Sequence, residues 1–252
     1  VLSQSMALMY QLKLFMNKQQ LLHFKRGIYR LRKDLVGNII SVGVSPFLMN
    51  LCACLIVIFM NNQLVRYGGD LSVGSYGIAN AISTIFLMFV IGVNQGMQPI
   101  AGYNYGSQQL DRLIKVLQLA ILSATIIMTT GWMIAMFLPY YCARLFTTDP
   151  TLIEISIKAI RIDMLFFPFV GSQMVITNFF QCIRKVKVSI FLSLSRQLLF
   201  LLPLLYILPQ FFGLDGVWYA LPASDITAAI VANIIMFKYM GRLKKTDKNH
   251  QQ

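Results

Sequence analysis

The sequence is poor in charged residues, and above all in acidic ones. Only nine of its 252 residues are Asp or Glu, and all charged residues together make up 12%, about half the share that is usual in a soluble domain. Hydrophobic residues make up 57%, and the mean hydropathy is +0.64. A soluble fold has too little interior to cover so much apolar surface, and disordered chains are polar. The composition therefore argues against a soluble globular enzyme and against a disordered chain.

Cysteine and histidine are also scarce. The four Cys residues lie in or beside apolar runs, and neither of the two His residues is spaced from them as a metal site requires. Cys52 and Cys54 are too close in the sequence for a normal disulfide. We interpret the cysteines as small buried hydrophobic residues. Because no nucleophile–base pattern is present either, the sequence predicts no catalytic residues and no metal site.

Long apolar runs dominate what remains. A membrane-spanning helix needs about 20 consecutive, mostly apolar residues. Turn-forming or polar residues, such as Gly68-Gly69-Asp70, separate these runs. We predict an all-α, polytopic membrane protein with a six-helix transmembrane lobe at 36–240. The six runs that meet the required length are 36–60, 74–101, 113–138, 152–182, 188–208 and 216–240.

The basic residues are distributed unevenly between the loops. The net charge is +13, and most Lys and Arg fall in the segment 13–33, in alternate loops after it, and near the C-terminus. The positive-inside rule places these segments in the cytoplasm. We therefore expect a basic cytoplasmic linker at 17–35 and a basic cytoplasmic tail at 241–252. A DNA-binding face would need the same charges on one soluble surface, so we expect no nucleic-acid partner.

Apart from charged residues that we assign to the ends of the predicted spans, three ionisable residues fall within the spans: Asp163, Arg196 and Asp225. Such side chains are costly in lipid and face the bundle interior or a wet cavity. At about 1.5 Å per residue, Arg196 and Asp225 both lie near mid-depth, where they can pair. The pair either fastens two helices together or has a direct functional role. Asp163 lies shallower, and is either an interfacial residue satisfied by Arg161 or water, or a functional residue.

Side-chain amides form a second polar group within the spans. Amides in membrane bundles often only bond neighbouring helices, but they also suit a cavity that accepts varied ligands. The sequence has 14 Met and 18 Phe residues, which can supply an adaptable apolar wall to such a cavity. Our candidates for its polar lining are Asn50, Gln95, Gln98, Gln173, Asn178 and Gln181.

The segment from Gly92 to Gly106, GVNQGMQPIAGYNYG, resembles the helix-eight motif of MATE (multidrug and toxic compound extrusion) transporters, especially the bacterial branch of Staphylococcus-type multidrug exporters. Members of this family have twelve spanning helices in two six-helix lobes. The resemblance implies that residues 1–16 are the end of a preceding transmembrane helix, and that this chain, which begins without Met, is the C-terminal half of such a transporter. Further similar segments are 61–70, 144–149, 178–181, 195–197 and 213–218.

The same resemblance implies a function. It implies export of lipophilic, often cationic, drugs across the bacterial inner membrane in exchange for Na⁺ or H⁺, with no other cofactor. The expected partners are these small molecules, membrane lipids and the N-terminal lobe. Some members carry a Glu in helix seven and an Asp in mid helix ten that have been tied to cation coupling. Here the corresponding polar residue of helix seven is Asn50, and the helix-ten position falls near Val170 or Gly171. We therefore expect the cation-binding acid in the N-terminal lobe.

Two alternatives remain beside the exporter. A lipid-linked oligosaccharide flippase of the same superfamily handles anionic pyrophosphate and tends to carry several central Arg or Lys residues, whereas Arg196 is the only one at mid-depth in this sequence. An integral membrane enzyme would need a cytoplasmic or mid-depth cluster of His, Asp or Glu, which the sequence does not have. We therefore favour the exporter and expect no enzymatic activity.

Overall fold

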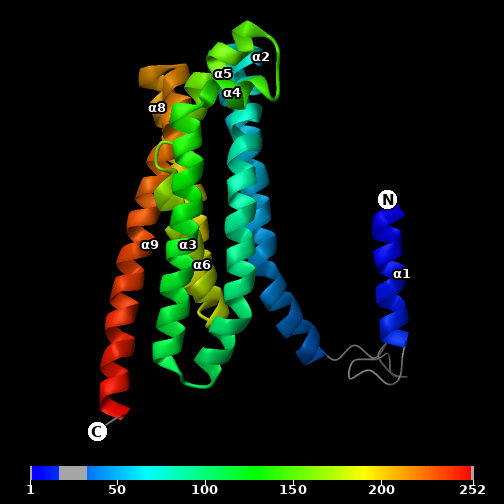
Figure 1. Cartoon of the computed structure of the whole chain (residues 1–252), viewed down its shortest axis with the longest axis vertical. Coiled ribbons are helices and arrows are strands. Elements are labelled where there is room, and N and C mark those ends of the chain that lie inside the picture. The colour runs from blue at the N-terminus through cyan, green and yellow to red at the C-terminus, as the bar shows by residue number, and fades with distance from the viewer. Residues whose placement is uncertain (1, 17–32, 251–252) are drawn as a thin grey trace. The chain divides into compact units, whose positions relative to one another are not determined.

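The computed structural model describes residues 2–16 and 33–250 (Figure 1), and the described part is helical without strands. This confirms the predicted all-α fold class. The helices are α1 (Leu2–Met16), α2 (Lys33–Gly106), α3 (Leu110–Phe137), α4 (Pro139–Arg144), α5 (Pro150–Asp163), α6 (Phe167–Cys182), α7 (Val186–Leu194), the π-helix η1 (Ser195–Leu201), α8 (Leu202–Phe212) and α9 (Leu214–His250).

The chain forms two compact units, residues 1–46 and 47–252. The first unit contains α1, which covers the residues predicted to end a preceding transmembrane helix, and the start of α2. Most of the predicted linker, residues 17–32, lies outside the described residues. The second unit contains all the other helices.

Within the second unit, α2 consists of two arms, 47–68 and 70–106, that run beside each other and are joined at Gly69 (Figure 1). Gly69 has φ +69° and ψ −171°, which is not helical, and glycine adopts such positive φ values without steric cost. Side chains from both arms, including Ile56 and Ser83, line one cavity. A straight helix of the 57 residues from Asn50 to Gly106 would be about 85 Å long, far longer than the membrane core of about 30 Å. The arms therefore correspond to the first two predicted spans.

Two other predicted spans are not continuous α-helices. The run 152–182 is broken into α5 and α6, which are bent by 52° relative to each other. The run 188–208 passes through α7, the π-helix η1 and α8. Within the described residues, four helices are long and apolar enough to cross a membrane, and the bent α5–α6 pair makes a fifth. When the two arms of α2 are counted as two crossings, the described helices make six crossings, which is the predicted number.

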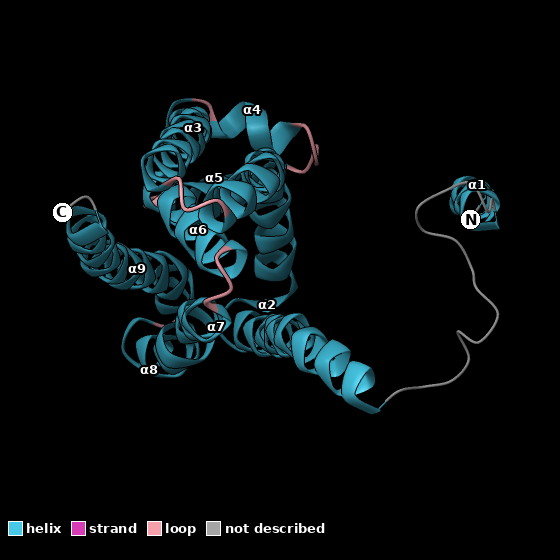
Figure 2. Cartoon of the chain, turned by 90° about the horizontal axis from the view of Figure 1, so that it is seen from below, coloured by secondary structure: helices cyan, strands magenta, loops and turns pink. Residues whose placement is uncertain are grey.

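Helix α6 lies inside the bundle, as the view along the helices shows (Figure 2), and packs against α3, α7 and α9. Its side chains Val175, Ile176, Phe179 and Phe180 are almost completely buried. The α2–α3 and α6–α7 connections and the end of α9 lie at one end of this unit (Figure 1), whereas α4 and the α8–α9 connection lie at the other. This arrangement alternates as a membrane-spanning chain requires.

The cysteines follow the prediction only in part. Cys52 and Cys142 are buried and Cys182 is half-buried, but Cys54 is exposed. Residues two positions apart point to nearly opposite sides of a helix, so Cys52 and Cys54 cannot both face the core. The expectation that all four are buried was therefore wrong.

Gly171 permits the close approach of α6 to α3. A Cβ atom at this position would lie 2.9 Å from the carbonyl oxygen of Ala124 in α3. Small residues at such contacts let membrane helices pack closely. By contrast, a Cβ atom at Gly92, on the exposed side of α2, would meet no other atom within 4 Å.

We expect Gly171→Ala to lower the free energy of unfolding by about 1–3 kcal/mol, because the added methyl group overpacks the α3–α6 contact. Thermal unfolding of the purified protein in detergent measures this loss. Gly92→Ala is the matched control, and it should leave stability unchanged or raise it by up to about 1 kcal/mol. Equal effects of the two substitutions would contradict the close-packing account.

Candidate functional site

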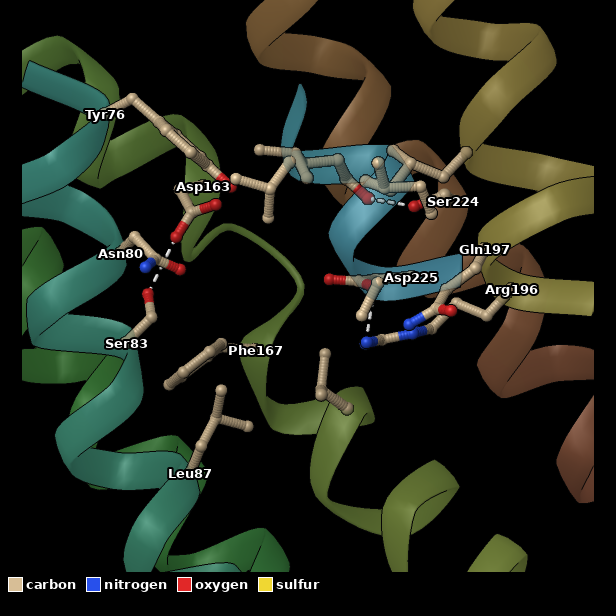
Figure 3. Close-up of a pocket in the computed structure, with 16 residues that line it drawn as sticks. Tyr76, Asn80, Ser83, Leu87, Asp163, Phe167, Arg196, Gln197, Ser224 and Asp225 are labelled. Carbon is tan, nitrogen blue, oxygen red and sulfur yellow. Dashed lines mark hydrogen bonds and ion pairs between the residues drawn. The ribbon is translucent and has the colours of Figure 1, made fainter. Parts of the chain in front are cut away.

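A cavity of about 280 Å³ lies among the two arms of α2, the α5–α6 break, η1 and α9 (Figure 3). It contains two carboxylates and one guanidinium, and most of the other side chains that line it are apolar. We call it the charged cavity. Its polar lining comes from Tyr76, Asn80, Ser83, Asp163, Arg196, Gln197, Ser224 and Asp225.

Interruptions of the helices place the charged groups there. Asp163 is the last residue of α5, so its carboxylate stands at the break before α6. Arg196 lies in the π-helix η1, and short π-helical segments are common at functional sites. Asp225 follows Pro222 in α9, where proline frees a backbone carbonyl and favours a bend. Asp163 and Arg196 thus come from two different irregular segments, and Asp225 lies one turn after a proline.

Arg196 and Asp225 form the ion pair that their predicted depths suggested. Arg196 Nη1 donates a hydrogen bond to Asp225 Oδ1 at 3.2 Å, and the two side chains are 33% and 20% exposed. A charge in a low-dielectric interior is strongly unfavourable unless it is paired and hydrogen-bonded. The pair also connects η1 to α9.

The structure brings Asp163 into the charged cavity. Its Oδ2 accepts a hydrogen bond of 2.7 Å from Ser83 Oγ, and Tyr76 points toward it in Figure 3. Arg161 is exposed and forms no ion pair with Asp163. The structure thus gives no support to Arg161 as its partner, and the functional interpretation of Asp163 stays a prediction.

The charges in the cavity do not balance. Among the described residues, Arg196 is the only basic one that lines it, and it pairs with Asp225. When both carboxylates are ionised, one negative charge stays without a cationic partner among the residues that the structure describes. A proton or a monovalent cation can neutralise that charge, and the oxygens of Asp163, Ser83 and Asn80 are suitable ligands for a hard cation. Within the described residues, no three His, Cys, Asp or Glu side chains gather as a divalent metal site would require.

A second cavity, of about 200 Å³, adjoins η1. We call it the amide cavity, and Arg196 and Gln197 line both cavities. None of the described residues that line it is acidic. They are Ile91, Asn94, Gln173, Met174, Thr177, Asn178, Gln181, Ser193, Arg196 and Gln197.

Three of the six amides predicted to line a cavity do so: Gln173, Asn178 and Gln181. Gln98 instead donates a hydrogen bond of 2.8 Å from its Nε2 to Asn178 Oδ1, so it joins two helices, which was the alternative interpretation. Asn50 and Gln95 are exposed and line neither cavity. For these two residues the structure gives no support to the predicted cavity.

Asn94 is not among the six amides predicted to line the cavity, although it belongs to the same polar group. It lines the amide cavity, it is 2% exposed, and its Oδ1 has no hydrogen-bond partner among the described residues. Residues four apart share one face of a helix, so Asn94 belongs with Gln98, whereas Gln95 points elsewhere. This spacing was visible in the sequence and could have identified it.

The family follows from comparison with known proteins. The family model MatE matches residues 44–207, a segment that includes α3, α5, α6 and η1 together with most of α2. This is more than half of the chain. The chain therefore belongs to the MatE family, as the resemblance of its helix-eight motif indicated.

Named relatives agree with this assignment. The chain is 24% identical over 229 residues to the multidrug export protein MepA of Staphylococcus aureus (strain bovine RF122 / ET3-1), covering 91% of this chain and 50% of MepA. It is 33% identical to the solved MATE multidrug transporter DinF-BH, with a TM-score of 0.79, covering 94% of this chain and 52% of that one. A MATE structure in the straight conformation gives a TM-score of 0.82 at 23% identity, covering 95% and 54% of the two chains, which supports the fold alone.

The chain spans about half the length of the curated relatives that it matches. These curated relatives are named as multidrug export proteins, and the solved DinF-BH is named as a multidrug transporter; neither name is that of an enzyme. A member with two lobes would provide a second six-helix bundle of similar size, so the half-length coverage is consistent with the predicted single lobe.

We expect the Arg196–Asp225 pair to be energetically coupled. Arg196→Gln or Asp225→Asn alone leaves the remaining charge unpaired, which should lower the free energy of unfolding by about 1–3 kcal/mol, because the groups are partly exposed. The double variant should lose less than the sum of the two single losses. Unfolding of the purified proteins in detergent measures all three.

The exposed ion pair between Lys158 and Asp215 is the matched control for this cycle. Its coupling should stay below about 1 kcal/mol, as is usual for surface pairs. Strictly additive losses at Arg196 and Asp225 would show that the contact contributes nothing to stability.

Proposed function

We propose that this chain is the C-terminal lobe of a secondary transporter that exports lipophilic, often cationic, drugs or toxic compounds in exchange for Na⁺ or H⁺. The observation that carries the proposal is the charged cavity, in which two carboxylates and one guanidinium lie between helices of a MatE-family chain. The relatives named as multidrug exporters support the same function.

Asp163 is the residue of this lobe that we propose to take part in coupling. Arg196 already neutralises Asp225, so Asp163 carries the charge that an entering proton or Na⁺ would balance. Asp163 also ends α5 at the bend before α6. When the carboxylate at this break is neutralised, the preferred angle between α5 and α6 changes. Alternating access needs a segment that switches between two such conformations. This proposal departs from the expectation that the coupling acid lies only in the N-terminal lobe.

The amide cavity suits the substrate side of the function. Amides such as Gln173 and Asn178 cannot change charge, so they can offer donors and acceptors but cannot exchange a proton. A pocket of this kind discriminates weakly between ligands, by about 1–3 kcal/mol per contact. Weak discrimination is the property that a multidrug exporter requires.

The flippase alternative receives less support from the charges. A pyrophosphate group would need uncompensated basic side chains. In the described part of the chain, Arg196 is the only basic residue that lines either cavity, and Asp225 neutralises it. The net charge of the charged cavity therefore favours a cation.

We propose that the complete transporter lies in the bacterial inner membrane and includes an N-terminal six-helix lobe. The α6–α7 connection carries Arg184 and Lys185 and lies at the same end as the end of α9 (Figure 1). By the positive-inside rule this end would face the cytoplasm. The lipophilic cations would then leave from the end that contains α4.

Substituting Asp163 tests the function directly. In proteoliposomes that contain the complete transporter, Asp163→Asn should lower dye export driven by a Na⁺ or H⁺ gradient by at least about tenfold, because the site can no longer change its charge. Asp111→Asn, at an exposed position at the start of α3, should export like the wild type.

If Asp163→Asn still exports dye and the export still depends on the ion gradient, Asp163 has no role in coupling. Wild-type protein that moves no dye under either gradient would overturn the exporter proposal as a whole.

A further inference from the structure

A third hollow lies outside the two cavities, between α4 and α5. Its volume is about 370 Å³, and Tyr140, Arg144, Thr148, Ile153, Glu154 and Ile157 are among the residues that line it. Arg144 and Thr148 belong to the segment 144–149, which is one of the segments that resemble the family. This segment lines neither the charged cavity nor the amide cavity.

The length of α3 places this hollow at the level of lipid headgroups. Helix α3 has 28 residues and is therefore about 42 Å long. The hydrocarbon core of a bilayer is about 30 Å thick, and about 40–45 Å including the headgroup regions. When α3 crosses the membrane, its last residue, Phe137, and the helix α4 that follows lie in the headgroup region of one leaflet.

The surroundings of the hollow are apolar but exposed. Phe137 is 77% exposed, Tyr141 is 64% exposed and Leu145 is 84% exposed. Apolar and aromatic side chains so placed suit the boundary between headgroups and acyl chains, where Tyr is enriched. An amphiphile therefore fits this region better than a soluble ligand does.

Two opposite charges line the hollow without pairing with each other. The guanidinium of Arg144 lies 6.0 Å from the centre of the Tyr140 ring, and Glu154 comes from the first turns of α5. Both side chains are exposed, and no ion pair joins them. Ile153 and Ile157 provide the apolar part of the lining. One separate positive and one separate negative group match a ligand that carries both a phosphate and an ammonium group.

We propose that this hollow binds the headgroup of a zwitterionic phospholipid. Arg144 contacts the phosphate, Glu154 contacts the ammonium group, and Ile153 and Ile157 contact the glycerol carbons. The exposed side chains Phe137 and Leu145 lie against the acyl chains. This site is independent of the coupling role proposed for Asp163.

Native mass spectrometry of the purified protein in detergent, with added dioleoyl-phosphatidylethanolamine or dioleoyl-phosphatidylglycerol, tests the proposal. The wild type should retain the ethanolamine lipid about threefold to fivefold more tightly, which is the effect of one partly exposed charge contact. Glu154→Gln should lower that affinity to the level of the glycerol lipid and leave the glycerol lipid unaffected. Arg144→Gln should weaken both lipids, because both carry the phosphate.

Arg66→Gln is the matched control. Arg66 is an exposed arginine beside a tyrosine ring, at 5.7 Å from the centre of Tyr67, and it does not line the hollow. It should leave the retention of both lipids unchanged. Soluble glycerophosphoethanolamine at millimolar concentration should displace neither lipid, because it lacks acyl chains.

Three results would each overturn the proposal. The first is equal retention of the two lipids by the wild type. The second is the same loss in Arg66→Gln as in Arg144→Gln. The third is displacement by the soluble headgroup, which would assign the hollow to a soluble zwitterion. Dye export by the complete transporter is measured separately, so its failure would bear on the proposed function and not on this site.

Discussion

The cost of placing a charge inside a membrane governs the arrangement of this lobe. Asp225 is tolerated there because Arg196 donates a hydrogen bond to it at 3.2 Å, and Asp163 is held by the hydroxyl of Ser83 at 2.7 Å. Two carboxylates and one guanidinium line the same cavity, and the guanidinium pairs with Asp225, so the described residues leave one charge that they do not neutralise. An unfavourable charge of this kind is rarely kept without a function, and an exchangeable cation is the simplest use for it.

Irregular helix geometry brings these groups together. In a straight helix the backbone hydrogen bonds are satisfied internally, and the depth of each residue follows from its position. This bundle instead bends at Gly69, breaks between α5 and α6, and changes to a π-helix at Ser195–Leu201. Backbone irregularity at membrane depth is tolerated where it is buried in protein or lines a cavity. Asp163 and Arg196 lie at two of these irregular places, and the charged cavity lies between them.

Apolar run length and charge pattern predicted the helical fold, the crossing segments and the Arg196–Asp225 pair, since all of these depend on position along a helix. They did not show that Asp163 lines the same cavity as Asp225, because Pro168 indicates a break in the helix but not the direction of the 52° bend. They also failed to separate Asn94 from Gln95, because a count of polar residues ignores which side of a helix each one occupies. Gln98 shows the same limit, since its hydrogen bond to Asn178 depends on a partner 80 residues away.

Infrared difference spectroscopy can show whether Asp163 takes up a cation, because it observes carboxyl groups themselves. Spectra of the purified protein would be recorded on adding Na⁺ at constant pH and on lowering the pH without Na⁺. We expect a carboxyl band that changes under at least one of these conditions, disappears in Asp163→Asn and persists in Asp111→Asn. The same band in Asp163→Asn as in the wild type, or no change at all, would contradict the claim that the unneutralised charge of this lobe belongs to Asp163 and takes up a cation.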